Sequence, residues 1–368
     1  MSIVENIPLW MRTIYRLLGV VQFSYKTPTS FSRCIPRIYC IPVFILYGYC
    51  CYSYYSIKFM LRNTIVQKVD FIISSVGVLS TTTSLLLFGL RSSKLKLLLL
   101  TLDKLKSHSL HEIRQKNYLK NISLVIILLH VLLSLIFPTV FIREVYYFMP
   151  VTVGLFDHLF LNEILESVRA EFAIINEELS RHALFTRIIT ITADGTIQQQ
   201  SKKEIDFTLR RVEEVILRHC DLVSLVFNIN KLFSITTVAS MITWFVYVTD
   251  IIYYFLQTTA GSKLSLQDWI FISTNASLFF LWLPIMVRMY SRVQKEANET
   301  SAFVHDLWNG CSKTEDKDRK IYHLELVSLR LLNNKLYLTA NSFFYLDETF
   351  CHTMVAAVAT YVIILFQF

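Results

Sequence analysis

The last hydrophobic stretch of the chain, residues 350–368, combines bulky apolar side chains with a stripe of small and polar ones. On a helix, positions spaced four and three apart share one face, and that spacing aligns Thr353, Ala357, Thr360, Ile364 and Gln367. Such a stripe can pack against another helix, or it can line an aqueous pore that conducts ions. The spacing alone leaves both possibilities open.

A second group of residues could bind a small organic cation. An acidic residue lies among aromatic residues on or beside one face of a predicted helix, in the set Trp244, Tyr247, Asp250 and Tyr254. A carboxylate among aromatic rings can hold a protonated amine by ion pairing and cation–π attraction. The alternative is that the aromatic residues form an interfacial belt and that Asp250 pairs with Arg143.

Other residues at a similar depth are candidates for the same ligand site. Each of them could equally be a packing residue: Phe137, Tyr147, Trp269, Ser273 and Thr274.

Two ionisable residues, His130 and Asp157, fall within hydrophobic stretches and at similar depth, so antiparallel neighbours could pair them, with His158 nearby. Ionisable groups inside a membrane cost about 2.5–3.5 kcal/mol each on insertion scales and usually have partners. The pair could be structural, or it could act as a proton or gating switch.

No catalytic arrangement is visible in the sequence: there is no glycine-rich phosphate loop, no nucleophile elbow and no metal-ligand spacing. His108 and His111 lie three residues apart on a basic stretch, with no third ligand nearby. We therefore expect no enzymatic activity, no metal and no cofactor.

Membrane-spanning helices must position these residues. The chain of 368 residues is 54% hydrophobic and 17% charged, whereas soluble domains are about 25% charged, and its mean hydropathy is +0.46. About 20 apolar residues cross a bilayer. Seven stretches meet that requirement: 38–59, 69–90, 121–142, 145–165, 232–256, 269–289 and 350–368.

The basic residues predict the orientation. Of the 36 Lys and Arg residues, 31 fall in alternate loops, which are 1–37, 91–120, 166–231 and 288–349. The positive-inside rule then places the N-terminus in the cytoplasm and the C-terminus outside. The net charge of +8 is mostly a topology signal and needs no nucleic-acid partner.

Two other classes of membrane protein fit less well. A G-protein-coupled receptor needs an outer N-terminus, and the chain lacks an E/D-R-Y triplet after its third span. A secondary transporter would show inverted repeats and broken helices.

The long inner segments predict cytosolic helices, with a break near Ala193-Asp194-Gly195 and a polar turn at 309–320. Their apolar faces must be buried. The partner surface could lie within one subunit or in an inner domain shared by several subunits.

Three segments resemble insect gustatory receptors. TYVIILFQF (360–368) matches the TYhhhhhQF signature that closes those proteins. LRHCDLVSLVFNINKLFS (217–234) is similar to the family's H-x-x-L…N-x-x-F/Y run. TANSFFYLDETF (339–350) is similar to the stretch before the last helix, where the family often has Gly in place of Ser342. The N-terminal two-thirds of the chain resembles the family only in hydropathy and charge pattern.

The resemblance implies an all-α protein with seven transmembrane helices that assembles as a homotetrameric, ligand-gated cation channel. In that arrangement, 1–37 is a cytoplasmic N-terminal segment, and 38–290 holds helices one to six with their extensions 91–120 and 166–231. Residues 291–349 form an anchor segment, and 350–368 is the pore-lining helix.

The resemblance also implies the functional sites and partners. Gln367 and Phe368 match gate positions near the outer end of the pore, and the ligand pocket lies in the outer half of spans two to six. If Phe368 is the last residue, four carboxylates would form an acidic ring that favours cations. The implied partners are a small-molecule tastant, identical subunits with other gustatory receptors as the alternative, and the lipid of the plasma membrane of chemosensory neurons.

The residues leave the class of tastant open. Sugar sites are expected to use many hydroxyl-bonding and acidic groups, whereas the outer halves here are dominated by Tyr, Phe, Trp and aliphatic residues. We therefore favour bitter plant compounds, with sugars as the alternative.

Overall fold

The chain folds into long helices. The computed structural model describes residues 7, 9–18, 20, 45, 47–49, 51–53, 56, 65–105, 141–192, 198–261, 266–311 and 319–367. Its elements are α2 (Leu9–Leu17), α5 (Ile65–Leu105), α7 (Phe141–Thr192), α8 (Gln198–Gly261), α9 (Leu266–Cys311), α10 (Arg319–Asn333), β1 (Thr339–Ala340), β2 (Phe344–Tyr345) and α11 (Glu348–Phe366). The predicted all-α class is confirmed for this part of the chain.

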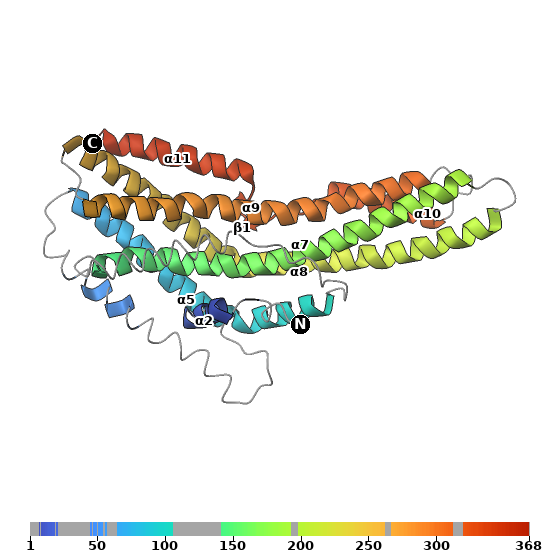
Figure 1. Cartoon of the computed structure of the whole chain (residues 1–368), viewed down its shortest axis with the longest axis horizontal. Coiled ribbons are helices and arrows are strands. Elements are labelled where there is room, and N and C mark those ends of the chain that lie inside the picture. The colour runs from blue at the N-terminus through green and yellow to red at the C-terminus, as the bar shows by residue number, and fades with distance from the viewer. Residues whose placement is uncertain are drawn as a thin grey trace, which may run out of the picture.

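Four of these helices are longer than a bilayer is thick. They contain 41 (α5), 52 (α7), 64 (α8) and 46 (α9) residues. At 1.5 Å per residue, α8 extends for about 96 Å, whereas the hydrocarbon core of a bilayer is about 30 Å thick. Each helix runs without a break from a predicted span into a predicted cytosolic extension (Figure 1). The predicted break near residue 194 lies between the end of α7 and the start of α8.

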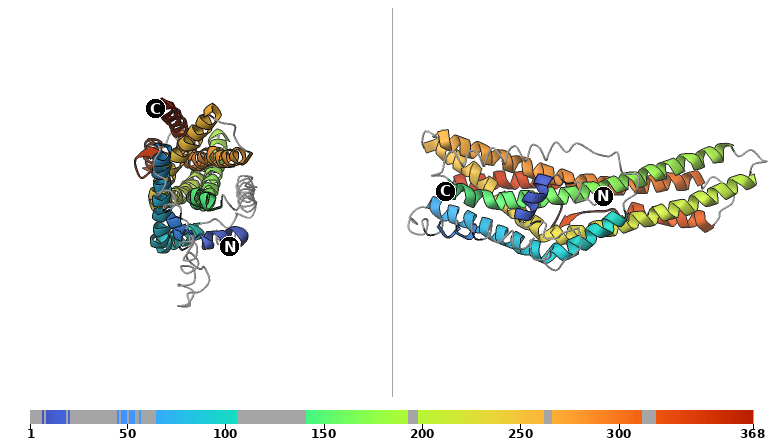
Figure 2. Two further views of the ribbon diagram at one scale, coloured as in Figure 1. Left: turned by 90° about the vertical axis from the view of Figure 1, so that its left-hand side faces the viewer. Right: turned by 60° about the horizontal axis from the view of Figure 1, so that its bottom comes forward.

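The three longest helices form the spine of the molecule. In Figure 1, α10 lies along one half of α9 and α11 along the other half. Helix α5 packs against α7 and α8, and α11 packs against α8 and α9. The end-on view in Figure 2 shows the bundle with α11 at its edge.

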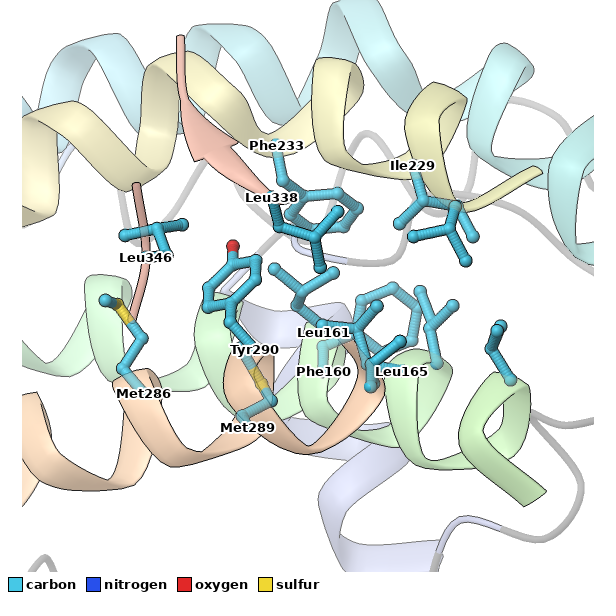
Figure 3. Packing of buried hydrophobic residues seen from close by; sticks show 14 of the residues in the cluster. Phe160, Leu161, Leu165, Ile229, Phe233, Met286, Met289, Tyr290, Leu338 and Leu346 are labelled. Atoms are coloured by element: carbon cyan, nitrogen blue, oxygen red, sulfur yellow. The ribbon is translucent and has the colours of Figure 1, made fainter. Parts of the chain in front are cut away.

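The core is densest where α7, α8 and α9 face one another. Phe160, Phe233 and Tyr290 are almost completely buried there. Leu338 and Leu346, which flank the two short strands, extend this core between α8 and the other two helices (Figure 3). Apolar burial of this kind stabilises a fold by about 25 cal/mol per Å².

A two-stranded hairpin connects α10 to α11. Its register pairs Thr339 with Tyr345 and Ala340 with Phe344. The turn residues Asn341 and Ser342 have φ angles of 50° and 63°, and the N–H of Phe343 donates to Ala340 O at 3.0 Å. Two positive φ angles define a type I′ turn, which favours Asn and Gly. The bend is therefore made with Ser at a position where the resembling family often has Gly.

Composition supports membrane insertion of two described helices. By length and apolarity alone, stretches of α8 (Phe207–Leu256) and α11 (Glu348–Leu365) could cross a bilayer. The sequence predicts seven spans. Two of them, 38–59 and 121–142, lie mostly outside the described residues.

The hairpin turn generates a stability prediction. Ser342→Gly should stabilise the protein by about 0.5–1 kcal/mol, because glycine adopts a positive φ without the steric cost of a Cβ. The measurement is the midpoint of thermal unfolding of the purified protein in lipid nanodiscs. Ser342→Ala keeps the Cβ and should give no gain. A lower midpoint for the glycine variant would contradict the assigned turn.

Candidate functional site

A buried ion pair joins three helices at the centre of the molecule. The guanidinium of Arg91 on α5 pairs with the carboxylate of Asp157 on α7, and both side chains are 3% exposed or less. Arg91 Nη1 also donates to Thr236 Oγ1 on α8 at 3.4 Å. Its Cζ lies 4.5 Å from the ring centroid of Phe88 and 4.1 Å from that of Phe233. The cation is thus held between two aromatic faces, which adds cation–π attraction to the ion pair.

The sequence pattern predicts a cytosolic segment at 91–120 that includes Arg91, and it gives this residue no partner. The sequence does contain an indication that Arg91 needs a partner on another helix. Arg91 directly follows an apolar span and has no acidic residue within one helical turn. Such an arginine needs a partner from another helix if the helix continues. His130, the predicted partner of Asp157, lies outside the described residues, so that predicted pair stays a prediction.

His158 occupies the position next to this ion pair and faces Trp282 on α9. The two rings are 5.1 Å apart in a T-shaped arrangement, and both side chains are buried. Among the described residues, neither ring nitrogen of His158 nor the indole nitrogen of Trp282 has a hydrogen-bond partner. Buried polar groups normally have partners. Three buried nitrogen atoms without a hydrogen-bond partner among the described residues thus lie at this contact between α7 and α9.

The predicted ligand residues of α8 differ in how deeply they are buried. Trp244 and Tyr247 are buried, whereas Asp250 and Tyr254 are partly exposed. The side chain of Arg143, the alternative partner of Asp250, lies outside the described part of the structure.

The other predicted ligand residues are less central where they are described. Trp269 is 48% exposed, with its ring 5.9 Å from that of Phe255, and Ser273 is exposed. The backbones of Tyr147 and Thr274 lie in α7 and α9, but their side chains are outside the described residues, as is the whole of Phe137.

The last helix lies on the surface of the subunit. In the apolar 18-residue stretch of α11 that could span a membrane, only 11% is buried within the subunit, against 61% for the corresponding stretch of α8. Val358 and Val362 are buried, and the ring of Tyr361 contacts that of Phe245 on α8 at 5.4 Å. The Asp347 carboxylate accepts a hydrogen bond from Phe350 N at 2.9 Å and so caps the helix. Asp347 therefore acts as the N-cap of α11.

The predicted stripe lies away from the packed face of α11. Four of its five members are exposed and the fifth is partly exposed, in the order Thr353, Ala357 (partly), Thr360, Ile364 and Gln367. At 100° per residue, the stripe is turned by more than 90° from Val358 and Val362. Phe368 lies outside the described residues.

The ion pair generates a prediction on α7. Asp157→Asn should destabilise the protein by about 3–5 kcal/mol, because it leaves the Arg91 guanidinium buried without a counter-charge. The double variant Arg91→Leu/Asp157→Leu should recover most of that loss. The measurement is the unfolding midpoint together with the amount of protein at the cell surface.

An exposed ion pair on the same helix provides the control. Arg181 and Glu177 are 73% and 66% exposed, so Glu177→Gln should change stability by less than about 0.5 kcal/mol. A double variant as unstable as Asp157→Asn would show that the two buried charges are not coupled.

The comparisons with known proteins agree with this architecture. The family model of the 7tm chemosensory receptors matches residues 11–368. Putative gustatory receptor 28b of Drosophila melanogaster is 29% identical over 145 residues, which are 38% of this chain and 30% of that protein. The alignment thus spans less than a third of the relative's length.

Two solved structures have a similar fold. They are the insect olfactory receptor OR5 from Machilis hrabei in complex with eugenol (TM-score 0.64) and a second structure of the insect olfactory receptor OR5 from Machilis hrabei (TM-score 0.62). Each is 14% identical to this chain and covers 97% of both chains. The predicted resemblance is confirmed: the chain belongs to the 7tm chemosensory receptor family of membrane-embedded insect gustatory and odorant receptors.

Proposed function

We propose that this chain is a subunit of a homotetrameric gustatory receptor that acts as a tastant-gated, non-selective cation channel. It spans the plasma membrane of a chemosensory neuron with its N-terminus in the cytoplasm. Four copies of α11 line the pore, and the ligand binds within the helix bundle of each subunit. Bitter plant compounds are the favoured tastants.

The exposure of α11 is the observation that carries this proposal. The helix packs on α8 and α9 through one face, and its stripe of small and polar residues is turned the other way. Gln367 is poorly suited to lipid contact, because a side-chain amide in hydrocarbon needs partners, whereas the hydroxyl of Thr360 already donates to Ala356 O at 2.9 Å. Four copies arranged around an axis would give these residues water and ions as their surroundings.

The interior of the bundle supports a small aromatic ligand. His158 and Trp282 supply aromatic surface together with nitrogen atoms able to donate or accept hydrogen bonds. Few polar groups in a mostly apolar site are typical of pockets for apolar small molecules. A sugar would require more hydroxyl-bonding groups, so bitter compounds remain the favoured class and sugars the alternative.

The proposal predicts a cation current in membrane patches. Outside-out patches from cells that express this chain alone should conduct when quinine, caffeine or salicin is applied in nucleotide-free solution, because the subunits themselves form the pore. Sucrose and fructose are tested in parallel. Patches from well-labelled cells that stay silent toward both groups would contradict a homomeric channel, and a current that requires GTP would favour a G-protein-coupled receptor.

Two alanines of α11 provide a matched pair of variants for the same recording. Ala357 belongs to the stripe, whereas Ala359 is exposed off the stripe. Ala357→Leu should lower the single-channel conductance by narrowing the pore, and Ala359→Leu should leave it unchanged. Equal conductances in both variants would exclude the proposed pore face.

The proposed orientation is tested by cysteine labelling. Cys220 is exposed and Cys311 is buried, and both lie in segments predicted to be cytosolic. Burial raises the pKa of the Cys311 thiol to about 11, so it carries little reactive thiolate at neutral pH. A membrane-impermeant maleimide should label Cys220 only after permeabilisation, and Cys311 slowly even then.

Peptide mass spectrometry reads out both sites in the same sample. The labelling rate of Cys311 should rise about tenfold per pH unit below its pKa, in step with the thiolate fraction. Rapid labelling of Cys220 on intact cells would reverse the proposed orientation.

A further inference from the structure

A glutamine of α9 is inserted into the hairpin that precedes the last helix. Leu338 and Leu346 lie opposite each other, one position beyond the paired residues of β1 and β2. Leu346 N donates a hydrogen bond to Leu338 O at 3.0 Å. The second hydrogen bond of such a pair is replaced by the side chain of Gln294. Its Oε1 accepts from Leu338 N at 3.3 Å, and its Nε2 donates to Leu346 O at 3.0 Å.

An asparagine one turn further along α9 binds the same segment. Asn298 Oδ1 accepts from Leu336 N at 2.7 Å, and Asn298 Nδ2 donates to Leu336 O at 3.1 Å. From the other side, Asn230 Nδ2 on α8 donates to Thr339 O at 3.0 Å. We call the two amides of α9, Gln294 and Asn298, the amide clamp.

The amide clamp fixes where the backbone of Leu336, Leu338 and Leu346 lies along α9. Apolar packing of Leu338 and Leu346 is non-directional, so it allows small shifts along the helix. Each clamp amide forms one bond to an N–H and one to a C=O, and both resist sliding because hydrogen bonds weaken with distance and misalignment.

The clamped segment leads directly into α11. Leu346 is followed by Asp347, which caps the helix, and the ring of Phe344 stacks on that of Phe350 at 4.4 Å. Among these residues, Asp347 alone lies between Leu346 and Glu348, the first residue of α11. A displacement of α9 at Gln294 is therefore passed to the inner end of the last helix.

The other half of α9 contains Trp282, which faces His158. From Trp282 to Gln294 is 12 residues of uninterrupted helix, about 18 Å at 1.5 Å per residue. Pro284 lies within this stretch, where its missing N–H removes one backbone hydrogen bond and favours bending. Helix α9 thus connects the candidate ligand level with the clamp.

We propose that Gln294 and Asn298 are positioning residues that couple displacements of α9 to the opening of the pore lined by α11. This inference rests on the proposed channel function. A ligand that shifts the outer half of α9 moves the clamp, the clamp moves the start of α11, and the pore face turns or tilts. Without the clamp, α9 can move while α11 keeps its position and the pore stays closed.

The first test needs neither ligand nor current. Gln294→Met and Asn298→Leu keep the side-chain volume but remove the hydrogen bonds. In lipid nanodiscs, amide exchange at 336–338 and in the first turn of α11 should rise about tenfold for the loss of two hydrogen bonds. Asn309→Leu, at an exposed position of α9, should leave exchange unchanged. Unchanged exchange in both clamp variants would show that the clamp does not hold α11.

The second test measures gating one channel at a time. In outside-out patches exposed to saturating quinine, the open probability per channel should fall about fivefold or more in each clamp variant, which is the size of a typical coupling between sites. Single-channel conductance should stay the same, because the pore face is intact. A purely structural role would reduce the number of channels and leave the open probability of each at the wild-type value, which would overturn the proposal.

The two tests separate the clamp from the channel assignment. Wild-type protein that is silent toward quinine, caffeine, salicin, sucrose and fructose, together with the expected exchange pattern, would support the clamp and refute the homomeric channel. If the side-chain variants do not reach the membrane, an amide-to-ester replacement at Leu338 removes only its N–H. Wild-type open probability in the ester protein, or its absence from the membrane, would identify the clamp as a folding element and overturn the coupling role.

Discussion

The crossing of α5, α7 and α8 depends on the buried ion pair between Arg91 and Asp157. An arginine inside an apolar bundle is costly unless its charge is matched and its donors are used, and here it contacts α5, α7 and α8 together. The two aromatic faces around the guanidinium leave it little freedom. This contact therefore sets the level at which the three helices cross, and the surrounding apolar core packs around that level.

Two groups of polar residues in the described interior bear on the proposed function. Near the ion pair, His158 and Trp282 offer nitrogen atoms to the interior of the bundle. Further along α9, Gln294 and Asn298 bind the backbone that leads into α11. Hydrogen bonds in a low-dielectric interior are strong and directional, so Gln294 and Asn298 can specify geometry in a way that apolar side chains cannot, whereas the nitrogen atoms of His158 and Trp282 have no such partner among the described residues. Continuous helices connect the two groups.

The single subunit leaves its last helix largely uncovered. Helix α11 buries one face against α8 and α9 and exposes the rest. A side chain such as Gln367 gains little from hydrocarbon, whereas it is well placed beside water. The proposed tetramer is based on this uneven burial of α11. Assembly around a central axis would give the exposed surface of α11 one side that faces lipid and another that faces the pore.

The sequence by itself determined the helical class, the family and the stripe on the last helix, because these depend on periodicity and on motifs within a few turns of chain. It also indicated where α7 gives way to α8. Only the tertiary structure decided that Arg91 pairs with Asp157, 66 residues away, and that Gln294 binds Leu346, 52 residues away. Helical periodicity fixes which residues share a face, but the partner of that face depends on how distant helices cross, and no local pattern encodes that crossing.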